Sequence, residues 1–116
     1  MNLRQSLHLP DLPQPIVLIL HAVDRERIEG KYVMGRIPEE GGRLAVIFDD
    51  SVTFHRDIVE KYGVKPLGGG WCSIDTRTRT LLLSSRSTQY GMEPDRNLTL
   101  AVFQAHFANY LCDRTE

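Results

Sequence analysis

A histidine placed where an apolar run gives way to a helix is the feature of this chain best suited to chemistry. Residues 44–48 predict a strand, and residues 54–62 predict a short helix with His55 in its first turn. Unpaired N–H groups and partial positive charge let an anion such as phosphate bind at a first turn. An imidazole there can move a proton near neutral pH. The pattern indicates phosphoryl chemistry, and the alternative is a histidine that merely lies at the surface.

A loop of hydroxyl and glycine residues, 87–91, is the second candidate. A turn of this kind at a strand end can point several N–H groups at one anion. We expect the Ser87 hydroxyl and the backbone N–H of Gln89 to donate to a bound phosphate. Lys31 would add a cation if its strand neighbours the strand that leads to His55. The alternatives are an ordinary turn and a solvated lysine.

Three consecutive glycines, Gly68, Gly69 and Gly70, follow the predicted helix. They lack the Gly-Lys-Ser or Gly-Lys-Thr continuation of a P-loop, and no helix opens after them as in a dinucleotide fingerprint. Glycines inside a strand usually mark a bulge or a close approach of other atoms to the backbone. We therefore predict a packing role for them, beside a bound anion or under a helix.

Composition excludes several other classes of function. The chain has 14 Lys and Arg against 15 Asp and Glu, so it lacks the basic footprint of a general nucleic-acid binder. The longest apolar run, 16–20, is too short to cross a bilayer, and the first residues lack an apolar signal core. Cys72 and Cys112 are the only cysteines, and no histidine lies at metal-ligand spacing from them. These features predict a cytoplasmic protein with free thiols, no zinc site and no membrane partner.

The hydrophobic pattern predicts the elements that must position these residues. The continuous apolar run 16–23 fits a strand buried on both faces, and Gly63 fits the end of the first helix. A second helix is expected from Pro94 or Asp95 to Leu111 with a wide aromatic face. The prediction for residues 1–116 is one α+β domain, a single mixed β-sheet of five to six strands flanked by two helices. The predicted strands are 16–23, 31–37, 43–48, 67–74 and 79–87.

The order of these motifs resembles the Janus/ocnus family, which contains phosphohistidine phosphatase. The resemblance is carried by His55 with Asp57 and Ile58 after it, Leu67 before the glycines, Ser73, and the spacing from Ser87 to Tyr90 and Gly91. It extends from Phe54 to the final helix. The family fold is a mixed sheet flanked by two helices.

This resemblance implies metal-independent hydrolysis of a phosphoramidate bond, with no cofactor. It implies that His55 is the general base and that Ser87 and the Gln89 backbone bind phosphate together with the amides of His55 and Arg56. Lys31 resembles the family's strand lysine. The expected substrate is a phosphorylated protein or a small phosphoramidate.

The chain also departs from the family pattern. Two family arginines are replaced in this chain: one by Trp71, directly after the glycines, and one by Ile47, on the strand before His55. The family's last strand is expected to be absent, with the segment 16–23 in its place. These departures support an alternative hypothesis, a non-catalytic module on the same fold. Such a module would bind phosphate or a phosphorylated or acidic protein, or would form a homodimer through the aromatic face of its last helix.

Overall fold

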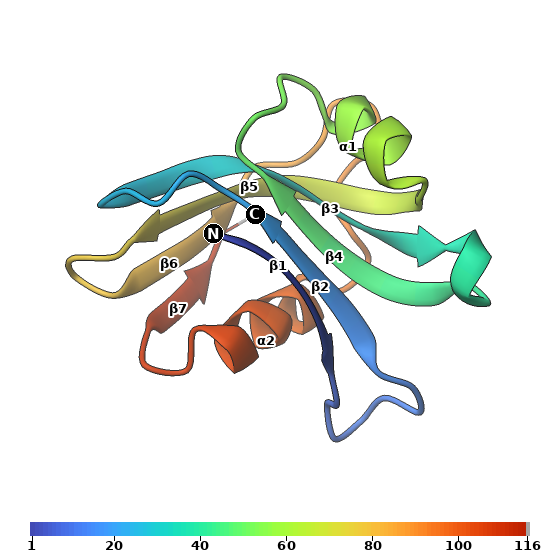
Figure 1. Ribbon diagram of the computed structural model, residues 1–116, viewed down its shortest axis with the longest axis horizontal. Coiled ribbons are helices and arrows are strands. Elements are labelled where there is room, and N and C mark those ends of the chain that lie inside the picture. The colour runs from blue at the N-terminus through green and yellow to red at the C-terminus, as the bar shows by residue number, and fades with distance from the viewer. Residues whose placement is uncertain (116) are drawn as a thin grey trace.

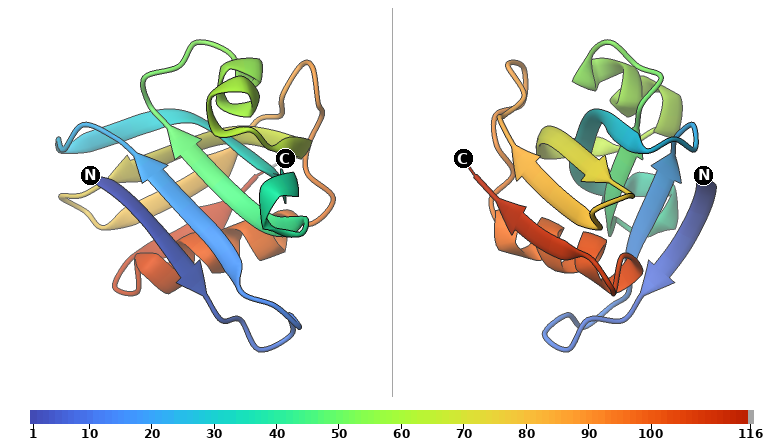
Figure 2. Two further views of the ribbon diagram at one scale, coloured as in Figure 1. Left: turned by 45° about the vertical axis from the view of Figure 1, so that its right-hand side comes forward. Right: turned by 90° about the vertical axis from the view of Figure 1, so that its left-hand side faces the viewer.

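One mixed sheet of seven strands and two α-helices form the computed structural model, which describes residues 1–115. The strand order is β1-β2-β4-β3-β5-β6-β7. The pairs β2–β4 and β6–β7 are parallel, and all other neighbours are antiparallel. The sheet is strongly curled (Figure 2). The strands are β1 (Asn2–Leu7), β2 (Ile16–His21), β3 (Arg27–Ile37), β4 (Arg43–Asp49), β5 (Lys65–Asp75), β6 (Thr80–Ser84) and β7 (Leu111–Arg114).

The two helices cover opposite faces of this sheet (Figure 1). Helix α1 (His55–Tyr62) packs on the outer face over β3 and β5. Helix α2 (Arg96–His106) lies inside the curl and contacts β2 and β7. A one-turn 3-10 helix, η1 (Pro38–Glu40), joins β3 to β4. The mixed sheet with two flanking helices confirms the predicted α+β class.

Strand β2 is buried on both faces, as its continuous apolar run predicted. Ile16, Leu18 and Leu20 belong to the core under α2, whereas Val17 belongs to the core under α1. The period of two along a strand sends alternate side chains to the two helices. A strand sandwiched in this way needs apolar residues at nearly every position.

The strand count of five to six was too low, because the strands at both edges of the sheet were missed. Most residues of β1 are exposed and polar, so its sequence lacks a buried-strand pattern. The predicted end of the second helix is also wrong, because residues 107–110 form a turn and strand β7 begins at Leu111. The expected absence of a last strand is therefore wrong, and β2 adds to the sheet rather than substituting for that strand.

Helix α2 ends at His106 because the next residues are held in a turn. The side chain of Gln104 donates to the carbonyl oxygens of Phe107 and Tyr110, at 3.0 and 2.9 Å. The N–H of Leu111 then donates to the Arg79 carbonyl oxygen at 2.9 Å, which starts the pairing of β7 with β6. These bonds satisfy backbone groups that would have bonded within the helix if it had continued.

The aromatic face of α2 is part of the core and not an exposed surface. Phe103 is fully buried, and Phe107 is 6% exposed. The Phe103 ring packs edge-on against Tyr32 at a centroid distance of 6.0 Å. The interface that the alternative hypothesis placed on these rings is therefore occupied by the protein's own sheet. Within residues 1–115, neither helix combines the length and apolar character needed to span a membrane.

Candidate functional site

His55 is the first residue of α1, as predicted. Phe54 precedes it with extended backbone, and the Phe54 N–H donates to the Asp57 carboxylate at 2.8 Å. The Asp57 N–H donates back to the Phe54 carbonyl oxygen at 3.0 Å. The amides of His55 and Arg56 lie in the first turn, where an α-helix offers no acceptor. Gly63 closes the helix with φ 65°, as predicted, and its N–H bonds to the carbonyl oxygen of Val59.

The imidazole of His55 is held by the glycine strand. Its Nε2 atom lies 3.0 Å from the carbonyl oxygen of Gly70, and the residue is only 8% exposed. A carbonyl can only accept, so Nε2 carries the proton in the neutral ring and Nδ1 is the basic nitrogen. Burial, reinforced by the charge of Lys31, lowers the pKa of His55 against the opposing effects of the Gly70 bond and Glu93. The neutral ring needed for proton abstraction is therefore favoured.

A cavity of about 260 Å³ opens at the start of α1. It brings together four of the five residues predicted for the site, which come from β3, α1 and the β6–α2 connection. Arg86 adds a third cation, and no acidic side chain among residues 1–115 lines the cavity. The arrangement suits an anion beside a histidine. The residues that line it are Lys31, Phe54, His55, Arg56, Arg86, Thr88 and Gln89.

Ser87 lies behind the wall of this cavity and does not line it. The residue is 2% exposed, and its Oγ accepts hydrogen bonds from the N–H groups of Gln89 and Tyr90 at 3.3 and 3.1 Å. The hydroxyl oxygen thus shapes the turn, and the Gln89 N–H points at Ser87 instead of at the cavity. Thr88, which also carries a hydroxyl group, lines the cavity instead of Ser87. The sequence could have indicated Thr88, because it follows Ser87 directly in the same loop.

Side chains on both faces of the sheet approach the glycines of strand β5 closely, which confirms the predicted packing role. A Cβ atom on Gly69 would meet the Tyr32 carbonyl oxygen and would lie 2.9 Å from the His55 ring. A Cβ atom on Gly70 would lie 2.7 Å from the Arg96 guanidinium on the opposite face. The Gly69 carbonyl accepts from the Ser87 N–H at 3.1 Å, which ties the loop to the strand. Only glycine leaves room for the imidazole above and the guanidinium below.

A buried ion pair supports the site from inside the curl. Arg96 and Glu93 are 2.9 Å apart, and both side chains are fully buried. The Glu93 carboxylate also accepts from Tyr32 at 2.6 Å and Thr99 at 2.7 Å. Burial opposes its ionisation, but these bonds outweigh the cost and lower the pKa of Glu93. Arg96 in turn donates to the Gly69 carbonyl at 3.3 Å, so the pair anchors the strand that holds His55. Sequence reasoning missed this pair because both residues lie among ordinary surface-type residues in the chain.

The two positions that depart from the family pattern have clear structural roles. Ile47 is fully buried in the core under α1, so an arginine there would place a charge among apolar side chains. Trp71 lies opposite Lys31 in the register of β3 and β5. The Lys31 ammonium is 5.5 Å from the centre of the indole ring, within cation–π range. Trp71 therefore helps to place the cation that lines the cavity.

The other histidines lie away from this cavity. His106 contacts Gln5 through Nδ1 at 3.0 Å, and His8 is exposed. Within residues 1–115, no three His, Cys, Asp or Glu side chains are grouped closely enough to hold a metal ion. No family model and no curated protein matches the chain.

Proposed function

We propose that this protein is a distant relative of the Janus/ocnus family and hydrolyses a phosphoramidate bond of the phosphohistidine type. The observation that carries the proposal is the cavity in which His55 and the first turn of α1 meet three cations, Lys31, Arg56 and Arg86. A charge-assisted contact to phosphate contributes roughly 1.5–3 kcal/mol. Because Lys31 resembles a cation that the family pattern already contains, Arg56 and Arg86 are the two cations that offset the missing arginines.

The proposed reaction is an in-line attack of water on phosphorus. Nδ1 of His55 takes a proton as the water oxygen forms its bond to phosphorus. The phosphorus–nitrogen bond breaks, and the substrate nitrogen keeps the electron pair and leaves as neutral imidazole when its other ring nitrogen is protonated. The cations and the amides of His55 and Arg56 stabilise the charge on the phosphoryl oxygens. Orthophosphate departs, and His55 returns its proton to solvent.

The direct test compares hydrolysis of a phosphohistidine peptide by the wild type, His55→Ala and His8→Ala. Loss of the general base should reduce kcat by about 10²–10⁴-fold. His8→Ala should match the wild type, because His8 is exposed and does not line the cavity. Circular dichroism and urea unfolding check that both variants fold. Unchanged hydrolysis in His55→Ala would contradict the proposal.

An anion titration separates hydrolysis from simple binding. Inorganic phosphate or tungstate should perturb the His55 ring signals in NMR spectra, because the anion would bind beside the imidazole. Perturbation without hydrolysis of phosphohistidine would favour the non-catalytic phosphate-binding module instead. Absence of both effects would remove this cavity as an anion site.

A further inference from the structure

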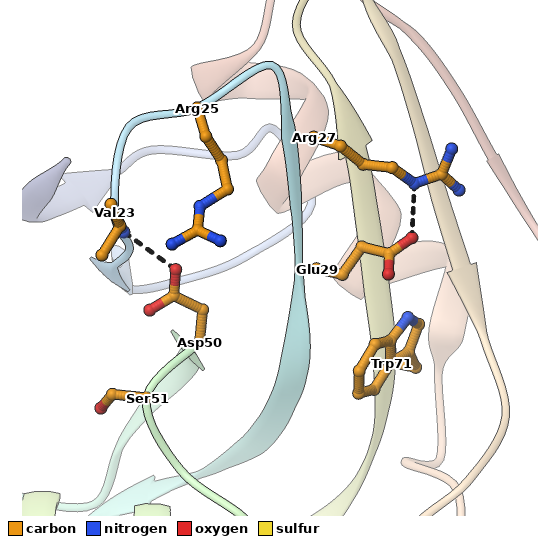
Figure 3. A pocket seen from close by; sticks show the side chains of 7 residues that line it. All are labelled: Val23, Arg25, Arg27, Glu29, Asp50, Ser51 and Trp71. Atoms are coloured by element: carbon orange, nitrogen blue, oxygen red, sulfur yellow. Dashed lines mark hydrogen bonds and ion pairs between the residues drawn. The ribbon is translucent and has the colours of Figure 1, made fainter.

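A second cavity, about 420 Å³ in volume, lies on the same face of the sheet as the His55 cavity. Its walls come from the β2–β3 connection, the start of β3, the turn after β4, and Trp71 of β5 (Figure 3). We call it the Trp71 cavity. None of the five residues predicted for the phosphate site lines it.

Two structural links join this cavity to the phosphate site. Lys31 lines the His55 cavity and lies against the ring of Trp71, which lines the second cavity. The segment 50–54 also passes between them, with Asp50 in the Trp71 cavity and Phe54 in the His55 cavity. A substrate that extends from the phosphate site past Lys31 toward Trp71 would therefore reach the second cavity.

We propose that the Trp71 cavity binds the polypeptide next to the phosphorylated residue. The substrate class is then a phosphorylated protein, and a free small phosphoramidate is the poorer substrate. This inference rests on the proposed function, because it takes the His55 cavity as the phosphoryl site.

The charges in the Trp71 cavity fit a peptide better than a second anion. Arg27 and Glu29 form an ion pair at 2.6 Å and so neutralise each other. Arg25 points into the cavity (Figure 3) and forms no ion pair with any residue of the range 1–115. The opposite charge belongs to Asp50, one of whose carboxylate oxygens accepts the Val23 N–H at 2.8 Å. Among residues 1–115, the charges that line this cavity therefore cancel, whereas those that line the His55 cavity are all positive.

The remaining surface of the cavity offers apolar contact. Trp71 presents a half-buried indole ring, and Val23 is 57% exposed although it is a large apolar side chain. An extended peptide provides carbonyl oxygens for a guanidinium donor, N–H groups for a carboxylate, and a side chain to pack on the ring. The Trp71 cavity contains all three partners: a guanidinium from Arg25, a carboxylate from Asp50 and the indole ring of Trp71.

The test measures how strongly each variant prefers a peptide substrate. The value of kcat/KM is determined for a short peptide with one phosphohistidine and for free phosphohistidine, and the ratio of the two is compared. Trp71→Ala should lower this ratio by about tenfold, because an aromatic anchor is lost. Arg25→Ala should lower it in the same direction without altering the contact between Trp71 and Lys31. Leu111→Ala is the control, since this side chain is 79% exposed on the edge strand β7.

Trp71 is the only tryptophan, so its fluorescence reports binding without any hydrolysis. The unphosphorylated peptide should change the emission of the wild type, and Arg25→Ala should weaken that titration. Hydrolysis with an unchanged ratio in both variants and no emission change would overturn the peptide site and leave the proposed function standing. An emission change without hydrolysis would overturn the proposed function and still support peptide recognition here.

Discussion

The Nε2 atom of His55 lies 3.0 Å from the carbonyl oxygen of Gly70, so a strand of glycines fixes the imidazole at the start of α1. The contact joins the start of helix α1 to strand β5. It also assigns the proton to Nε2 and leaves Nδ1 as the base.

Removing the charge of Lys31 should move the pH profile of hydrolysis. Burial and then Lys31 lower the pKa of His55 below its ordinary value of 6.5, so the base stays neutral to lower pH than a free imidazole. Lys31→Met removes one of these causes, and the acidic limb of kcat/KM should move to higher pH. NMR titration of the His55 ring checks the pKa, with Lys65→Met, an exposed lysine on β5, as the control. An acidic limb that stays in place or moves to lower pH would contradict the assignment of His55 as the base.

Breaking the buried Arg96–Glu93 pair should destabilise the fold strongly. Arg96→Met leaves the Glu93 carboxylate buried without its cation, which typically costs roughly 3–5 kcal/mol. Urea unfolding measures this change. Arg77→Met is the matched control, because the Arg77–Glu26 pair is 3.0 Å apart but its side chains are 73% and 63% exposed. The control should have little effect, since exposed ion pairs contribute little. Equal losses in the two variants would show that burial is not the cause.

A methyl group at Gly69 should impair the site as well as the fold. Gly69→Ala places a Cβ atom 2.9 Å from the His55 ring and against the Tyr32 backbone, so either the ring or the strand must move. Overpacking of this kind costs about 1–3 kcal/mol. Gly35→Ala is the control for backbone crowding alone, because its Cβ atom would lie 2.5 Å from the Lys65 carbonyl oxygen. Only Gly69→Ala should also lower the kcat of the folded protein, and a similar loss in both variants would rule out an effect through His55.

Stability should fall in acid as Asp49 becomes protonated. Burial opposes the ionisation of Asp49, but hydrogen bonds from Lys61, Ser51 and Tyr62 lower its pKa from 3.8 to about 2. The contribution is complete above the unfolded pKa of 3.8 and is lost as pH falls through about 2. It amounts to about 2 kcal/mol at neutral pH. Asp49→Asn should remove this part of the acid dependence, as urea unfolding at pH values across that range would show. An acid dependence equal to that of the wild type would contradict the prediction.

The sequence by itself determined the features that depend on local pattern. The apolar run of β2 predicted a strand buried on both faces, and the spacing from Phe54 to Gly63 predicted a short helix with His55 in its first turn. The three consecutive glycines predicted that other atoms would lie close to the backbone of their strand. Each of these signals is carried by neighbouring residues, because burial period and helix termination act over a few positions.

Only the tertiary structure decided which distant residues meet. The polar strand β1 and the short strand β7 exist because they pair with neighbours, and their own residues carry little strand signal. The register of β3 against β5 places Lys31 beside Trp71, and the Arg96–Glu93 pair is buried because the sheet curls around α2. Ser87 is buried for a similar reason, because its N–H donates to the carbonyl oxygen of Gly69 on strand β5. Strand register and the burial of charged groups depend on long-range pairing, which local periodicity does not encode.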